Sequence, residues 1–158
     1  MVVRVVKVLF TALVIAGAVF FIIRPDAEKG RVLRIKDAES GRVYGKKTLG
    51  ETREFAIEFI HSVHQSPVLE TFRAENGMIR VVSVRFASFG AGMQSDLEEG
   101  QTLIRDGDAM VITGYNASYK AINYIVGTVS DHILYVKDEA ISLRELCGRN
   151  AHIEIQIK

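Results

Sequence analysis

The dipeptide Asn76-Gly77 constrains the fold of this chain more than any other pair of residues, because it separates two runs that favour β-strands. The first run covers residues 68–75 and the second covers residues 78–89. Asn and Gly both accept the positive φ angles that a tight two-residue hairpin requires. The sequence therefore predicts an antiparallel hairpin here, with further antiparallel strands around it.

Short runs with strand character recur on both sides of this hairpin. Phe55, Ile57 and Phe59 fall at every second position, which is the pattern of a half-buried strand. In residues 78–89 apolar side chains fall on both alternating faces, as expected for a strand that is partly covered on each side. An Asp-Gly-Asp turn at residues 106–108 predicts a second hairpin. The remaining predicted strands cover residues 32–35, 42–44, 122–126, 133–137 and 153–157.

One short helix is predicted, over residues 142–147. Ser142 is its N-cap, Glu145 stands three residues later, and Gly148 follows its end. The chain lacks the regular alternation of strands and helices that a parallel sheet requires, and it lacks a glycine-rich phosphate loop. The predicted fold class is mainly β: an antiparallel β-sandwich or barrel-like domain over residues 31–158, with residues 25–30 as a linker.

A run of uncharged, mostly apolar residues occupies positions 8–23, and Val5 and Val6 extend it. Its length approaches the roughly 20 residues that cross a bilayer as a helix. Arg24-Pro25 ends it, because proline disfavours helix at the residue before it. Residues 1–24 are therefore predicted to form one transmembrane signal anchor. Small side chains that allow close packing against another membrane helix are Ala12, Ala16, Gly17 and Ala18.

Two other interpretations of this segment stay open. The small-x-small sequence 16–18 is the form that signal peptidase needs, which allows cleavage after Ala18. A buried core helix is the third interpretation, although the run is apolar on all sides. Basic residues lie on both sides of the run, so their count alone would not place the domain outside. The resemblance to an export signal predicts a single-pass protein of the cytoplasmic (inner) membrane, in contact with lipid, with its C-terminal domain on the extracytoplasmic side.

The charge pattern argues against a nucleic-acid partner. The formal net charge is +1, no block of basic residues occurs, and the chain has no tryptophan. Cys147 is the single cysteine, which excludes an internal disulfide. We interpret it as a small apolar residue and not as a nucleophile.

Polar residues concentrate between positions 61 and 70, where a β-rich core does not need them. His61, Ser62, Pro67 and Glu70 are the main members. If residues 63–67 form the bend between two paired strands, His61 lies opposite or near Glu70. A carboxylate beside an imidazole orients the ring and stabilises its charged form. We interpret this pair as a structural corner of the sheet, and as a ligand-facing or partner-facing site in the second place.

Catalytic and metal-binding interpretations of this cluster are weaker. His61, His64 and Glu70 could supply two imidazoles and a carboxylate to zinc, but no motif fixes the two histidines on one face. His61 and Ser62 are neighbours, so in a strand they point to opposite faces. No catalytic residue, metal site or cofactor is predicted.

Two glycines follow the second strand of the first hairpin. Phe89, Gly90 and Gly92 are expected at a bulge or tight strand exit, or at a small binding site lined by backbone amides. Three tyrosines could stack on a ligand, although tyrosines in a β domain are more often core or rim residues. They are Tyr115, Tyr119 and Tyr124.

These motifs together resemble a known family. The signature is His-Ser-Val, then Pro-Val and Glu, at His61 to Val63, Pro67, Val68 and Glu70, followed by Gly90-Ala91-Gly92. With Asp131-His132-Ile133-Leu134 and Ile141-Ser142-Leu143, it is similar to the prokaryotic domain-of-unknown-function family eighteen-fifty. The resemblance spans residues 31–157. Met93-Gln94 departs from it, because the family often has an apolar residue and then proline there.

The resemblance implies a context and not a reaction. Genes of this family tend to accompany TRAP-type (tripartite ATP-independent periplasmic) transporters of the TAXI class. The expected function is therefore a non-enzymatic, membrane-anchored accessory subunit that associates with the TRAP permease, with the TAXI-type solute-binding protein as a further partner. The alternatives are an independent exported ligand-binding β domain and, third, a zinc-dependent hydrolase.

Overall fold

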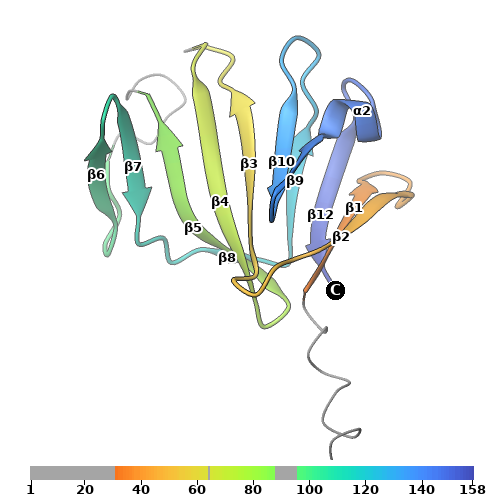
Figure 1. Cartoon of the computed structure of the whole chain (residues 1–158), viewed down its shortest axis with the longest axis horizontal. Coiled ribbons are helices and arrows are strands. Elements are labelled where there is room, and N and C mark those ends of the chain that lie inside the picture. Colours follow the sequence, from red (N-terminus) through yellow and green to blue (C-terminus); the bar gives the residue numbers. More distant parts are fainter. Residues whose placement is uncertain (1–30, 64, 88–95) are drawn as a thin grey trace, which may run out of the picture.

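A computed structural model describes residues 31–63, 65–87 and 96–158, which form two antiparallel β-sheets (Figure 1). The small sheet has the strand order β2-β1-β12-β9. The large sheet has the order β11-β10-β3-β4-β5-β7-β6, and β8 pairs with β5 beside it. The elements are β1 (Val32–Asp37), β2 (Val43–Thr48), β3 (Glu54–Ile60), β4 (Pro67–Glu75), β5 (Met78–Phe86), β6 (Thr102–Asp106), β7 (Ala109–Thr113), β8 (Ser118–Tyr119), β9 (Ala121–Ile125), β10 (His132–Val136), β11 (Glu139–Ser142), α2 (Leu143–Cys147) and β12 (His152–Ile157).

The mainly β, antiparallel prediction is confirmed, and so are the local signals on which it depended. Asn76 and Gly77 adopt φ angles of 51° and 73° in the turn between β4 and β5. Gly107 adopts 61° in the β6–β7 hairpin. The Ser142 hydroxyl accepts a hydrogen bond of 2.9 Å from the backbone N–H of Glu145, which caps α2 as expected.

A β-bulge in β5 explains why the apolar residues of the strand predicted at residues 78–89 fall on both alternating faces. Phe72 pairs with Val81 but Thr71 pairs with Ser83, so the extra residue of β5 is Val82. The bulge reverses the alternation of β5, because an inserted residue shifts every later side chain to the other parity. Ile79 and Phe86, of opposite parity, are therefore both buried.

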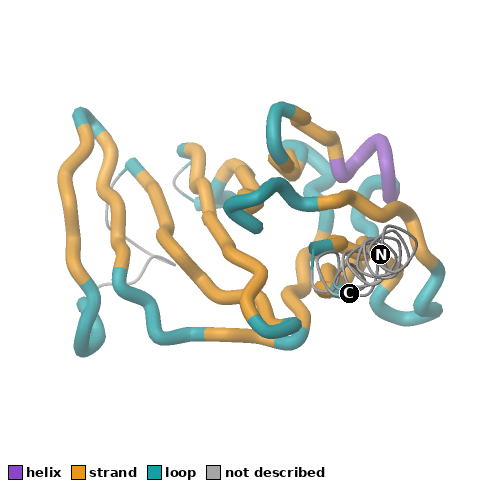
Figure 2. Tube along the Cα trace, turned by 60° about the horizontal axis from the view of Figure 1, so that its bottom comes forward, coloured by secondary structure: helices purple, strands orange, loops and turns teal. Residues whose placement is uncertain are grey.

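The two sheets overlap over only part of the large sheet. The main core lies where they face each other, and it includes Leu33 and Ile155 of the small sheet with Ile57 and Leu134 of the large one. A second, smaller cluster under β4, β5 and β7 contains Val68, Phe86 and Ile112. Figure 2 shows strands of the large sheet that continue to one side of the small sheet. The architecture is therefore sandwich-like, with a half-covered end.

Different segments of the chain lie at the two ends of the domain. At one end the start of β1 meets the end of the chain, where the backbone N–H of Lys158 donates a hydrogen bond of 2.9 Å to Val32. The end of β3, the start of β4 and residues 126–131, between β9 and β10, lie at the opposite end (Figure 1). The six-residue strand β12 separates these ends, a span of about 17 Å at the usual rise.

The predicted anchor, residues 1–24, and the linker, residues 25–30, lie outside the described residues, together with Ala12, Ala16, Gly17 and Ala18. Within the part of the chain that is described, no helix is both long and apolar enough to cross a bilayer.

Candidate functional site

Residues 61–63, 65 and 66 belong to the turn that closes the β3–β4 hairpin. The backbone N–H of His61 donates to the carbonyl of Ser66 at 2.9 Å, and the N–H of Gln65 donates to the carbonyl of His61 at 2.9 Å. Nδ1 of His61 accepts a hydrogen bond of 3.3 Å from the N–H of Val63. Gln65 adopts a φ angle of 51°. His61 therefore contributes to the conformation of a tight corner, as a structural interpretation expects.

The predicted pairing of His61 with Glu70 is wrong. Strand pairing stops at Ile60 and Pro67, so His61 belongs to the turn and not to the ladder. Glu70 lies opposite Ile57 instead. The sequence shows that a bend separates the two strands, but not where their pairing stops. The structure thus separates the two polar groups that the sequence suggested as one unit.

The predicted site residues line three separate depressions. His61 and Ser62 line one of about 570 Å³ at the corner, together with residues of the β9–β10 loop. Glu70 lines a second, of about 520 Å³, between the sheets. Pro67 lines a third, of about 550 Å³, with residues of the β6–β7 hairpin. The other candidates, His64, Phe89, Gly90 and Gly92, lie outside the described residues.

Exposed apolar side chains surround the corner. Val129 is 92% exposed, Val63 is 64% exposed and Ile125 is 57% exposed. Ile60, at the end of β3, is also exposed. We call Ile60, Val63, Ile125 and Val129 the distal patch, because they lie at the end of the domain opposite Val32 and Lys158 (Figure 1). Apolar groups that gather at one end of a soluble domain are typical of a contact surface.

Glu70 occupies a position where the fold otherwise places apolar residues. It lies on the inner face of β4, between the buried Val68 and Phe72. Its cross-strand neighbours are Ile57 and Val84. Residues directly opposite each other in an antiparallel sheet share a face. The row through Glu70 therefore crosses the sheet as Leu103, Ile112, Val84, Glu70, Ile57 and Leu134, with Glu70 as its ionisable member.

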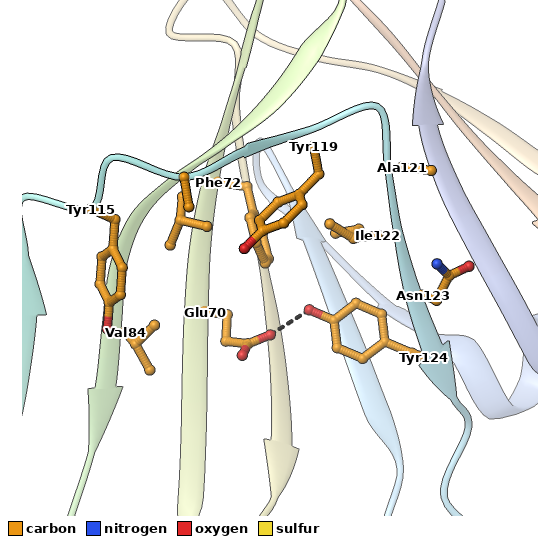
Figure 3. Close-up of a pocket in the computed structure, with 11 residues that line it drawn as sticks. Glu70, Phe72, Val84, Tyr115, Tyr119, Ala121, Ile122, Asn123 and Tyr124 are labelled. Atoms are coloured by element: carbon orange, nitrogen blue, oxygen red, sulfur yellow. Dashed lines mark hydrogen bonds between the residues drawn. The ribbon is translucent and has the colours of Figure 1, made fainter. Parts of the chain in front are cut away.

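Tyr124 of the small sheet reaches across to Glu70 of the large sheet and donates its hydroxyl hydrogen to Oε2 (Figure 3). Burial raises the pKa of Glu70 above its usual value, and the bond from Tyr124 only partly opposes that shift. Burial, and then the charge of Glu70, raise the pKa of Tyr124, so its hydroxyl remains a donor. The structure thus holds a partly buried carboxylate at a fixed place between the sheets.

Two further tyrosines complete this cavity, which we call the Glu70 cleft. Tyr115 and Tyr119 belong to the segment that crosses from β7 to β9, and Figure 3 shows Tyr115 and Tyr124 on either side of Glu70. Burial and the charge of Glu70 raise the pKa of Tyr115. The apolar part of the lining comes from Phe72, Val81, Val84 and Ile122.

An aromatic cluster lies between the Glu70 cleft and the corner. The ring of His132 stacks on Phe59 at 5.2 Å between centroids and meets the edge of Tyr124 at 5.7 Å. Nδ1 of His132 accepts a hydrogen bond of 3.2 Å from the N–H of Gly127. Burial lowers the pKa of His132, more than the nearby charge of Asp131 raises it. The cluster therefore separates the Glu70 cleft from the cavity at the corner, and its histidine is uncharged at neutral pH.

Asp131 begins a second stretch that carries the family resemblance, residues 131–134. Its carboxylate accepts hydrogen bonds from the Ser142 hydroxyl and from the backbone N–H groups of His132 and Arg144. Burial alone would raise its pKa, but these bonds and the Arg144 charge lower it. Asp131 thereby ties the start of β10 to the first turn of α2.

Two groups in the described residues bear on reactive chemistry, namely possible metal ligands and the thiol of Cys147. In the ranges 31–63, 65–87 and 96–158, no three histidine, cysteine or acidic side chains are grouped as metal ligands would be. Burial raises the pKa of the Cys147 thiol to about 11, so it is protonated at neutral pH and a poor nucleophile.

Comparison with known proteins shows which family carries these motifs. Residues 55–143, more than half of the chain, match the family described as a domain of unknown function (DUF1850). The chain belongs to the DUF1850 family. The matched range starts in β3 and ends at the first residue of α2, so it contains the corner, Glu70, the three tyrosines and Asp131. No curated protein matches the chain. No solved structure matches it either.

The sequence identified Glu70, His61 and Ser62 as site residues but assigned them to one corner. It named Tyr115 and Tyr124 only as possible stacking residues and gave His132 no role, because their surroundings depend on how the second sheet packs over the first. The spacing of the tyrosines was the available signal, because three of them lie within residues 115–124, a stretch that ends inside β9.

Proposed function

We propose that this DUF1850 protein is a non-enzymatic accessory subunit of a TAXI-type TRAP transporter, anchored in the cytoplasmic membrane by its N-terminal apolar segment. Membership of the family supports the transporter context, and the uncharged run at residues 8–23 supports the anchor. The observation that carries the proposal is the distal patch, where Val63, Ile125 and Val129 are all more than half exposed. A subunit that acts by contact needs such a surface.

The position of the distal patch is our reason for the choice of partner. The predicted linker has only six residues, so it reaches about 20 Å at most and keeps the Val32 end of the domain near the bilayer. With the strands upright on the bilayer, the distal patch would lie about 17 Å further out, at the other end of the strands. A partner that meets it there is a soluble extracytoplasmic protein, and we propose the TAXI-type solute-binding protein. The permease would contact the anchor instead.

Copurification from native membranes tests this proposal. The tagged full-length chain should recover transporter subunits, and V129D and I125D should lose the solute-binding protein but retain the permease. An aspartate in an apolar contact loses burial and adds an unpaired charge. I104D is the matched control, because Ile104 on β6 is 50% exposed and lies outside the distal patch.

The copurification has a clear contrary result. Recovery of the tagged chain without any transporter subunit, under conditions that preserve other membrane complexes, would refute the transporter context. Equal recovery of the solute-binding protein with V129D and with the unmodified chain would refute the distal patch as the contact surface. Circular dichroism of each variant shows whether the β domain has kept its fold.

A further inference from the structure

We propose that the Glu70 cleft binds a small organic cation, a molecule with a protonated amine or quaternary ammonium head and an apolar body, with Glu70 as its counter-ion. This site is separate from the distal patch and goes beyond the proposed docking function. Four features of the cleft support it: the charge of Glu70, the tyrosine rings, the apolar lining and the volume.

The first feature is a carboxylate without a basic partner in the described residues. Several acidic side chains elsewhere pair with basic ones, for example Glu54 with Arg73, and Glu154 with Lys36 at 3.2 Å. No such ion pair forms at Glu70 within the ranges that the structure describes, where the hydroxyl of Tyr124 is its hydrogen-bond donor. A carboxylate offers about four lone-pair positions, so acceptor capacity remains for a ligand.

Burial makes this unpaired charge unfavourable, and a cation would correct that. Because burial raises the pKa of Glu70, the ionised carboxylate is poorly solvated in the cleft. A positive head group placed against it would replace the missing hydration with a direct charge–charge attraction, which is strong where water is partly excluded. A ligand with a negative group would meet repulsion from Glu70. The carboxylate of Glu70 therefore predicts a positively charged ligand.

The tyrosine rings add to the same preference. Tyr115 and Tyr124 flank Glu70, and Tyr119 stands at the rim with 48% of its surface exposed (Figure 3). The π-face of a tyrosine attracts a cation, by about 0.5–1 kcal/mol at exposed positions and more where water is excluded. A carboxylate bordered by aromatic rings is thus suited to an ammonium head group.

The remaining lining and the size define the rest of the ligand. Phe72, Val81, Val84 and Ile122 provide apolar surface for a hydrocarbon body. The volume of about 520 Å³ falls within the roughly 300–1,000 Å³ of small-molecule sites. The cleft therefore fits a compact amphipathic cation better than a free metal ion or a long peptide.

Isothermal titration calorimetry of the full-length chain in detergent tests this inference at pH 7.5. The probes are phenethylammonium, the neutral 2-phenylethanol and the anionic phenylacetate, which share a benzene ring and differ in charge. Phenethylammonium should bind about tenfold more tightly than 2-phenylethanol, the order expected for one hydrogen bond to a charged group. Phenylacetate should bind more weakly than either.

Variants test whether Glu70 and Tyr119 cause the preference for the cation. E70Q should remove the tenfold preference while it leaves the affinity for 2-phenylethanol unchanged. E58Q is the matched control, because Glu58 accepts a hydrogen bond of 2.9 Å from the Tyr135 hydroxyl on the outer face of the same sheet. Y119A, at the exposed rim, should weaken phenethylammonium by about two- to fivefold, which matches one exposed cation–π contact.

Each contrary result has a distinct meaning. Equal affinity for the cation and the alcohol, no binding of phenethylammonium, or an unchanged preference in E70Q would each overturn the inference. Because the unmodified chain alone discriminates the probes, a folding defect in E70Q does not remove the test. V129D should bind phenethylammonium normally, so the cation site and the docking function succeed or fail independently.

Discussion

At the scale of single residues, the hydrogen bond from Tyr124 to Glu70 joins the two sheets through a polar contact beside the apolar core. Y124F should lower the free energy of unfolding by about 1–3 kcal/mol, because it removes a bond to a charged and partly buried acceptor. Chemical denaturation of the detergent-solubilised chain, followed by the near-ultraviolet circular dichroism of its tyrosines, measures the loss.

Y135F serves as the control for this change. The bond from Tyr135 to Glu58 has a length of 2.9 Å and lies on the outer face, where water can replace it. Its removal should cost less than about 0.5 kcal/mol, the usual range for surface substitutions. Equal losses in Y124F and Y135F would contradict the account of Glu70 as a partly buried charge.

The raised pKa of Glu70 gives a second residue-scale prediction, on pH. The folded chain binds the Glu70 proton more tightly than the unfolded chain, whose carboxyl has the usual pKa of about 4.5. This group therefore makes folding more favourable as the pH falls through its folded pKa towards 4.5, and E70Q removes that gain. Melting temperatures at pH 7.5 and pH 5 should show that the stability of the natural chain rises relative to E70Q on acidification. Parallel pH profiles would refute the shift.

At the scale of elements, local signals predicted the strands and both hairpins, because turn chemistry and alternation depend on neighbours in the chain. Asn76-Gly77 and the Asp-Gly-Asp turn at 106–108 are the clearest cases. Local signals did not predict the bulge at Val82 or the register of β3 against β4, since both depend on contacts between strands. For the same reason the sequence placed His61 beside Glu70 incorrectly.

The segment that crosses from β7 to β9 depends on Gly114. Its φ angle is 78°, and a Cβ atom there would lie 2.2 Å from the backbone oxygen of Gly100. G114A should therefore lower the free energy of unfolding by more than about 2 kcal/mol, through positive-φ strain and a backbone clash. The segment carries Tyr115 and Tyr119, so the same variant should also weaken binding of phenethylammonium.

G107A is the control for this element. Gly107 has a similar φ angle of 61°, but a Cβ atom there meets nothing within 4 Å. G107A should lower the free energy of unfolding by only about 1–2 kcal/mol, through the positive-φ strain alone, and should leave the Glu70 cleft intact. Thermal unfolding of both variants gives the comparison, and an equal loss would show that the contact with Gly100 does not matter.

At the scale of the whole molecule, the sequence predicted two regions, an apolar N-terminal segment and a β domain, and the β part is confirmed. It could not predict that the small sheet covers only one end of the large sheet, because that depends on how two twisted sheets pack. The half-covered end creates the Glu70 cleft, and the far ends of the strands create the distal patch. One small domain thus offers two separate surfaces.

In our proposal the distal patch faces away from the membrane and contacts the TAXI-type solute-binding protein. Photo-crosslinking in native membranes tests it most directly, with a photoreactive phenylalanine in place of Val129 and, as control, of Ile104. Both side chains are at least half exposed, but only Val129 belongs to the distal patch. We expect a crosslink to the solute-binding protein from position 129 and none from position 104. Crosslinks from position 129 to the permease or to lipid, or none at all, would contradict it.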